Sequence, residues 1–132
     1  VMMCYNLYGT HSGPGPKADP AFLQKMVKGM QTLPGKKSFA LATGGFDWTE
    51  KGKVVSLTYL DALALQRQHA ASAMRDAESG CLVFAYRDDM GKAHDVWYAD
   101  SQTLRLWMDT IEAMGAYDVN IWRLGGNNPW CE

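Results

Sequence analysis

Two short apolar runs, VMMCYNLY at residues 1–8 and SFALAT at residues 38–43, enclose a segment with the pattern of one amphipathic helix. Both runs are bounded by turn residues and have the length and composition of buried strands. Asp19 followed by Pro20 indicates an N-cap with proline in the first turn. Apolar residues then recur at helical spacing: Phe22, Leu23, Met26, Val27 and Met30. Strand, helix and strand in this order predict a parallel crossover unit, and therefore an α/β fold.

The pattern changes after residue 48. Thr58 and Asp61 have the spacing of a capping box and open a helix to about Ala71. Two alternating segments, residues 81–87 and 92–98, flank the sequence DDMG and predict a hairpin with a four-residue loop. Because this antiparallel piece interrupts the alternation of strands and helices, it indicates an inserted α+β subdomain.

The last part of the chain returns to the first pattern. From Asp100 a helix carries an apolar stripe and ends at Gly115, and a strand over residues 118–122 runs into a loop rich in glycine and asparagine. In a parallel α/β architecture the carboxyl ends of the strands carry the ligand site, so Trp122 can meet a ligand as well as pack in the core. The predicted organisation is residues 1–53, the insertion at 54–99, and residues 100–132.

Composition narrows the classes of function. The 132 residues are 47% hydrophobic, which suffices for a packed core, and the formal net charge of −1 gives no basic surface for nucleic acid. No apolar stretch approaches the roughly 20 residues that a membrane span needs. Cys4, Cys81 and Cys131 are too few and too scattered for a disulfide framework or a zinc site, so they are interpreted as unpaired small apolar residues.

The beginning of the chain is unusual. A buried strand starts at residue 1, with no initiator methionine, leader or N-terminal cap. We therefore expect this sequence to be a piece of a longer protein. The strand edges at Met3 and Asn120 would then lack partners, which predicts self-association of the isolated piece.

Four segments carry a resemblance to a known family: MCYN at residues 3–6 before a Gly/Pro loop, LPGKK at 33–37 before GFDW at 45–48, HDVWYAD at 94–100, and WRLGG at 122–126. In this order and spacing they resemble the C-terminal portion of glycoside hydrolase family 18. That family includes chitinases, N-acetylglucosaminidases that act on peptidoglycan, and non-catalytic chitinase-like lectins. The sequence is similar above all to the bacterial spore-lytic branch.

The resemblance implies the last three βα units of a TIM (β/α)8 barrel, with a small α+β insertion after the seventh strand. On this template, residues 1–8, 38–43 and 118–122 are strands six, seven and eight. The family's catalytic motif, Asp-x-x-Asp-x-Asp-x-Glu, lies on the fourth strand and does not occur in this sequence. The general acid is thus expected outside this chain, and the 132-residue fragment alone is expected to be an incomplete barrel without activity.

Family 18 enzymes are substrate-assisted: the 2-acetamido oxygen of the sugar replaces an enzyme nucleophile. The resemblance implies that Tyr5 positions this acetamide by a hydrogen bond and that Met3 lines the pocket. Trp122 would form the floor on which the sugar stacks, and Asp47 and Trp48 would border the groove. Tyr5 has an alternative interpretation as a core tyrosine.

Two departures from the family pattern concern the same site. Asn6 stands where the family usually has Asp, although an amide also hydrogen-bonds a hydroxyl group. Residues 42–45, ATGG, replace Pro-x-Tyr-Gly, so the subsite there is altered or more open. Among the histidines, His69 and His94 have no partners at metal-ligand spacing. His11 is interpreted as a solvated loop residue, with a place at the mouth of the site as the alternative.

These features predict the C-terminal part of a glycosidase that hydrolyses β-1,4-linked N-acetylglucosamine polymers, chitin or peptidoglycan, by a substrate-assisted retaining mechanism. The expected place of action is the cell envelope or the extracellular space. The expected partner is an N-acetylglucosamine-containing polysaccharide, with no nucleic acid, cofactor or metal. The first alternative is a non-catalytic chitinase-like carbohydrate-binding protein, and the second is a small α/β module that binds protein through its hairpin.

Overall fold

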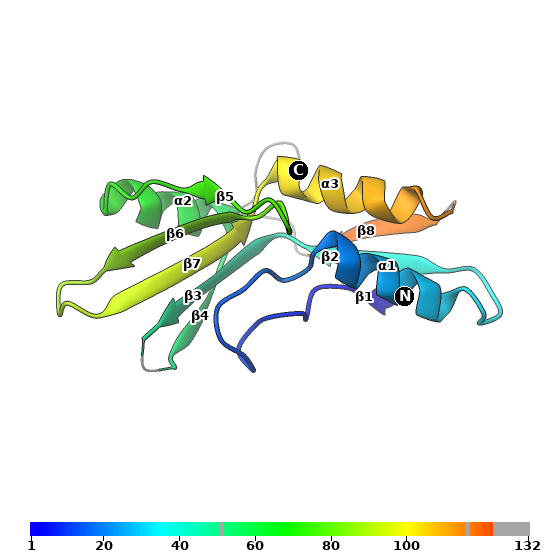
Figure 1. Ribbon diagram of the computed structural model, residues 1–132, viewed down its shortest axis with the longest axis horizontal. Coiled ribbons are helices and arrows are strands. Elements are labelled where there is room, and N and C mark those ends of the chain that lie inside the picture. Colours follow the sequence, from blue (N-terminus) through cyan, green and yellow to red (C-terminus); the bar gives the residue numbers. More distant parts are fainter. Residues whose placement is uncertain (51, 116, 123–132) are drawn as a thin grey trace.

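The computed structural model describes residues 1–50, 52–115 and 117–122. In this part of the chain two sheets lie end to end, with helices packed on them (Figure 1). The elements in chain order are β1 (Met2–Met3), α1 (Pro20–Met30), β2 (Ser38–Ala42), β3 (Gly44–Thr49), β4 (Val54–Leu57), α2 (Tyr59–Gln68), β5 (Met74–Arg75), β6 (Leu82–Arg87), β7 (Ala93–Ala99), α3 (Ser101–Glu112) and β8 (Asp118–Trp122).

The first sheet is parallel and has the order β1-β2-β8. Met2 pairs with Phe39, and Ser38 pairs with Asp118. The predicted crossover and the predicted last strand are therefore confirmed. Strand β1 is much shorter than residues 1–8, because the chain leaves the ladder after Cys4, whose N–H still donates to the Ala40 carbonyl at 2.8 Å.

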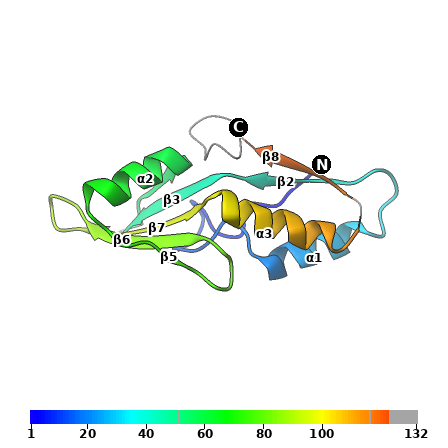
Figure 2. The ribbon, with the colours of Figure 1, turned by 90° about the horizontal axis from the view of Figure 1, so that it is seen from above.

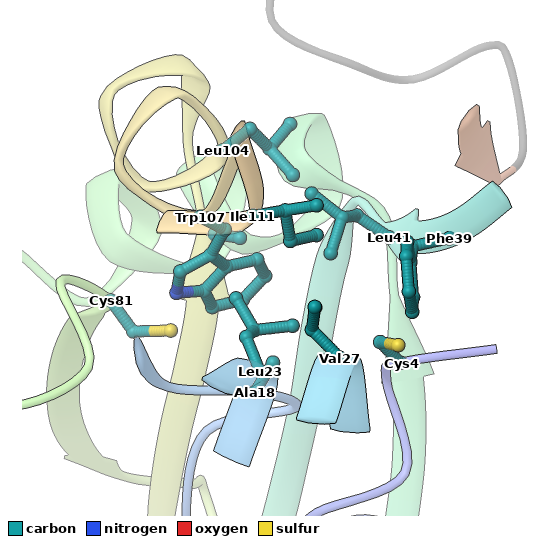
Figure 3. Close-up of a cluster of buried hydrophobic side chains, with 11 residues drawn as sticks. Cys4, Ala18, Leu23, Val27, Phe39, Leu41, Cys81, Leu104, Trp107 and Ile111 are labelled. Atoms are coloured by element: carbon teal, nitrogen blue, oxygen red, sulfur yellow. The ribbon is translucent and has the colours of Figure 1, made fainter. Parts of the chain in front are cut away.

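Helices α1 and α3 cover one face of this sheet and lie side by side along it (Figure 2). The Asp19 carboxylate accepts a hydrogen bond from the Phe22 N–H at 2.7 Å, so the predicted cap of α1 is confirmed. Figure 3 shows the core between the helices and β2. It consists of Leu23 and Val27 from α1, Phe39 and Leu41 from β2, and Leu104, Trp107 and Ile111 from α3, all at most 1% exposed.

The second sheet is antiparallel and has the order β4-β3-β7-β6-β5. Strand β3 was not predicted, because Gly44 and Gly45 indicated the end of the preceding strand. In the structure they are the first two residues of β3. A Cβ atom at Gly45 would lie 1.7 Å from the Trp97 carbonyl oxygen, and Gly44 has φ +72°. Glycine is required at residue 45 because β7 passes too close for any side chain, and at residue 44 because of the positive φ.

Helix α2 packs on one face of the second sheet, where Ala62 contacts Phe84, Val96 and Tyr98. Its capping box is confirmed in both directions, since Thr58 and Asp61 each accept from the other's backbone N–H. The helix ends at Gln68, before the predicted Ala71. The predicted hairpin is also present, but β7 begins at Ala93, one residue later than expected.

The chain passes from one sheet to the other through a single residue, Thr43, which separates β2 from β3. It returns at Ala99, the residue that pairs with Gly44. The second sheet thus begins before residue 54, where the sequence placed the start of the insertion.

Candidate functional site

The face of the first sheet that α1 and α3 leave uncovered carries a hollow of about 490 Å3. The alternation of side chains along parallel strands sends Phe39 and Leu41 toward the helices and Ala40 to this other face. The hollow is lined by residues from all three strands and from the positions on either side of β1: Val1, Met3, Tyr5, Ala40, Asn120 and Ile121. The structure therefore brings together two predicted site residues, Met3 and Tyr5.

The Tyr5 hydroxyl donates a hydrogen bond to the Met3 sulfur at 2.9 Å. A thioether is a weak acceptor, so a carbonyl oxygen of a ligand would compete well for this hydroxyl. Met3 is 60% exposed, which leaves its side chain accessible from the hollow. The pair thus provides a polar donor on a mostly apolar wall, to which Asn120 adds an amide, and this is the usual composition of a small-molecule site.

Two further predicted residues, Asn6 and Trp122, follow β1 and end β8, respectively. Asn6 is exposed and follows Tyr5 directly. The backbone of Trp122 ends β8 opposite Ala42, while its side chain and the glycine-rich loop after it lie outside the described residues. Their roles in a ligand site stay predictions.

Asp47 and Trp48 lie in the second sheet and do not line the hollow. Asp47 is 6% exposed, and its carboxylate accepts hydrogen bonds from the Tyr86 hydroxyl and the His94 ring. The Trp48 indole N–H donates to the carbonyls of Gly9 and Ser12 at 3.3 and 3.1 Å. These contacts hold both side chains within the fold, and a substrate-binding role for either residue stays a prediction.

Lys17 links the segment after β1 to the end of β2. Its ammonium group donates to the Thr43 carbonyl at 3.0 Å and lies 4.9 Å from the centre of the Phe46 ring. This arrangement combines a hydrogen bond with a cation–π contact. The Lys17 side chain thus holds the loop between β1 and α1 against Thr43, the residue that connects the two sheets.

The two described cysteines are free and buried. Burial raises the pKa of the Cys4 thiol to about 11 and that of the Cys81 thiol to about 12, so both stay neutral at ordinary pH. They pack as small apolar residues, as interpreted from the sequence, and Cys131 lies outside the described residues. Within these residues no His, Cys, Asp and Glu side chains gather into a metal-ion site, and no helix is long and apolar enough to span a membrane.

A polar cluster that the sequence did not reveal lies in the second sheet. The His94 ring contacts the Asp47 carboxylate at 2.7 Å through Nδ1 and the Asp88 carboxylate at 2.8 Å through Nε2. Tyr86, which pairs with His94 across the hairpin, stacks on its ring with centroids 4.4 Å apart. Hairpin register alone would have brought Tyr86 and His94 together, but Asp47 comes from the strand that was not predicted.

Comparison with curated proteins finds relatives among spore enzymes, although no family model matches the chain. The cortical fragment-lytic enzyme of Bacillus anthracis is 26% identical over 133 residues, which is 95% of this chain and 31% of that protein. The enzyme of the same name from Bacillus subtilis is 25% identical over 92 residues, which is 64% of this chain and 21% of that protein. The chain therefore spans less than a third of the length of these relatives.

Several solved structures contain a part with the same fold as this chain. The spore cortex-lytic enzyme SleL of Bacillus cereus matches 98% of this chain and 32% of its own, with a TM-score of 0.88 and 20% identity. A chitinase of Chromobacterium violaceum matches 98% and 41%, with a TM-score of 0.88 and 24% identity. A class V chitinase of Nicotiana tobaccum in complex with NAG4 matches 96% and 44%, with a TM-score of 0.73 and 16% identity. The fold is thus that of a part of chitinase-like barrel domains.

Proposed function

We propose that this chain is the C-terminal part of a glycosidase that hydrolyses β-1,4-linked N-acetylglucosamine polymers, chitin or peptidoglycan. It supplies substrate-binding residues, while the general acid belongs to another part of the protein. The place of action is the cell envelope or the extracellular space. The relatives named as cortex-lytic enzymes and chitinases support this function, as does their coverage of most of the chain.

The observation that carries the proposal is the position of the Tyr5 hydroxyl in the hollow on the uncovered sheet face. Tyr5 lies just beyond the carboxyl end of β1, and ligand sites of parallel α/β folds form at that end of the strands. A single hydroxyl on an apolar wall suits an N-acetyl group, because the carbonyl oxygen accepts the hydrogen bond and the methyl group packs against Met3 and Ala40.

In the proposed reaction the 2-acetamido oxygen of the substrate attacks the anomeric carbon, and the glycosidic oxygen leaves with a proton from the general acid. A positively charged oxazolinium forms and is opened by water, so the configuration at the anomeric carbon is retained. The Tyr5 hydroxyl exchanges the weak Met3 acceptor for the acetamide oxygen and thereby holds that oxygen in line. Trp122 supports the ring from below.

The test is Tyr5→Phe in the protein that contains this chain, with turnover of soluble chitooligosaccharides and peptidoglycan fragments as the readout. Loss of one positioned donor should lower kcat by about a hundredfold and change KM little. Tyr8→Phe is the matched control, since Tyr8 lies in the same segment, packs on Gly15 and does not line the hollow. An unchanged kcat in Tyr5→Phe would remove the proposed role of this hydroxyl.

A non-catalytic carbohydrate-binding protein is the alternative, and Asn6 favours it. Where the family usually has an acidic residue, this chain has an exposed amide that can bind a sugar hydroxyl but cannot act as a carboxylate. Calorimetry with an N-acetylglucosamine tetramer, combined with product analysis, separates the two functions. Binding without any product supports the alternative, whereas release of shorter oligosaccharides supports the enzyme.

A further inference from the structure

His94 lies between two carboxylates that come from different parts of the second sheet. Asp47 belongs to β3, whereas Asp88 follows β6 and opens the turn to β7. The side chains of His94 and Asp47 are 12% and 8% exposed, and Asp88 is at the edge with 32%. The ring is therefore largely buried. Its Nδ1 faces the Asp47 carboxylate at 2.7 Å and its Nε2 faces the Asp88 carboxylate at 2.8 Å.

This geometry specifies the protonation state of the ring. A carboxylate can only accept hydrogen bonds, and a neutral imidazole carries one N–H and one lone pair. With a neutral ring, one of the two nitrogens would present its lone pair to a carboxylate. Only the imidazolium donates to both acceptors, so both short contacts require the charged ring.

We propose that His94 is a pH-operated clamp, which as an imidazolium ties the turn over residues 88–92 to strand β3 and releases that turn when it loses a proton. The turn depends on Asp88. Its Oδ1 accepts from the backbone N–H groups of Met90 and Lys92, while its Oδ2 accepts from His94. One side chain thus connects the turn's internal hydrogen bonds to the ring.

The groups around the ring support a charged state. Tyr86 stacks on one face of His94, and His69, at the end of α2, stacks on Tyr86 with centroids 4.2 Å apart. The Thr49 hydroxyl lies 3.4 Å from Nδ1. Burial and the hydrogen bond to Asp47 raise the pKa of Tyr86, so this hydroxyl stays a donor to Asp47 and adds no negative charge.

The pH range of the clamp follows from opposite shifts in the pKa values of His94 and Asp88. Burial lowers the pKa of His94, but the hydrogen bonds to Asp88 and Asp47 outweigh burial and raise it above 6.5. While Asp88 is ionised, the clamp's contribution to stability is therefore complete below pH 6.5, and it is lost as the pH rises through the folded-state pKa of His94. The hydrogen bond from His94 and those from the backbone lower the pKa of Asp88 below 3.8. The clamp also opens in acid, as the pH falls through that lower value.

The test is nitrogen-15 NMR of histidine-labelled protein across pH 4 to 9, with hydrogen exchange of backbone amides in the same samples. At pH 6 both ring nitrogens of His94 should carry a proton. As the ring titrates above pH 6.5, the amides of Asp88 and Lys92 should lose protection beyond the ordinary base-catalysed increase. The amide of Gly80, which donates to the Asp76 carbonyl at the far side of the sheet, should keep its protection.

Two variants make the test specific. Asp88→Asn keeps an oxygen for the turn but offers Nε2 a donor, so the pKa of His94 should fall and the turn should no longer respond to it. Asp89→Asn removes the same charge from the exposed neighbouring residue and should leave the pKa unchanged. A ring with a single N–H at pH 6, or turn protection that ignores the titration, overturns the proposal. None of these measurements uses glycosidase activity, so they are independent of the proposed function.

Discussion

The guanidinium of Arg75 binds the carboxylate of Asp100 through two parallel hydrogen bonds, from Nη1 at 3.0 Å and from Nη2 at 2.7 Å. Arg75 belongs to β5 in the second sheet, and Asp100 caps α3, which covers the first sheet. Nη1 also donates to the Gly80 carbonyl at 2.8 Å. This single side chain therefore joins the edge of the second sheet to the helical layer of the first.

We expect Arg75→Ala to lower the free energy of unfolding by about 1–3 kcal/mol, because it removes charge-assisted bonds from a largely buried carboxylate. Arg75→Lys keeps the charge but not the planar pair of donors, so its loss should be smaller but measurable. Urea unfolding at pH 7 measures both. If both variants unfold at the midpoint of the parent protein, the bond does not stabilise the junction.

Gly45→Ala should destabilise the protein by about 3 kcal/mol, because its methyl group would overlap the Trp97 carbonyl and force β3 away from β7. Gly29→Ala is the matched control. Gly29 lies in α1, and a Cβ there meets nothing within 4 Å. This second change should stabilise the protein by about 0.5–1 kcal/mol. Thermal unfolding of the two variants would contradict the prediction if the Gly45 variant melted at or above the parent temperature.

Trp122→Ala should weaken binding of chitooligosaccharides at least about tenfold, which corresponds to about 1.4 kcal/mol. The reason is the loss of a large flat surface under the sugar ring. Trp122→Phe keeps an aromatic face and should retain most of the affinity. Calorimetry on the protein that contains this chain gives the comparison, and equal affinity of the alanine variant would rule out a sugar platform at this residue.

Residues 1–132 expressed alone should self-associate. Strands β1 and β8 are the edges of the first sheet, and Val1 and Met3 are 85% and 60% exposed on or next to β1. Such edges and apolar side chains favour pairing with further copies. Light scattering coupled to size exclusion would show a mass that rises with concentration, and Asn120→Lys on β8 should reduce it. A compact monomer at every concentration would refute this prediction.

Local signals in the sequence predicted the parallel part of the fold well. The caps at Asp19 and Thr58 and the apolar stripes of α1 and α3 act within a few residues, so the sequence alone indicates where these helices begin and which side is buried. The hairpin of β6 and β7 was predicted for the same reason. The length of its turn was not, because Asp88 and Lys92 close the turn with a backbone hydrogen bond that no sequence pattern indicates.

Strand β3 was missed because the strand that pairs with it, β7, lies about fifty residues further along the chain. Gly44 and Gly45 look like a turn unless their pairing with Ala99 and Tyr98 is known. The contacts of Asp47 and Trp48 could not be predicted for the same reason. As neighbours in a strand they point to opposite faces, one to His94 and the other to the loop at Gly9. Among the predicted site residues whose side chains the structure describes, Met3 and Tyr5 line the same hollow, because both come from β1 and the segment directly after it.

The pairing of Gly44 with Ala99 gives the molecule a modular design. The chain departs from the parallel framework and rejoins it at adjacent points, so the length of the excursion between them places no demand on the spacing of β2 and α3. A shorter connector between the same two anchors would keep the spacing of β2 and α3, but it would remove the Arg75–Asp100 bond and the Cys81 side chain that packs in the core with α1 and α3.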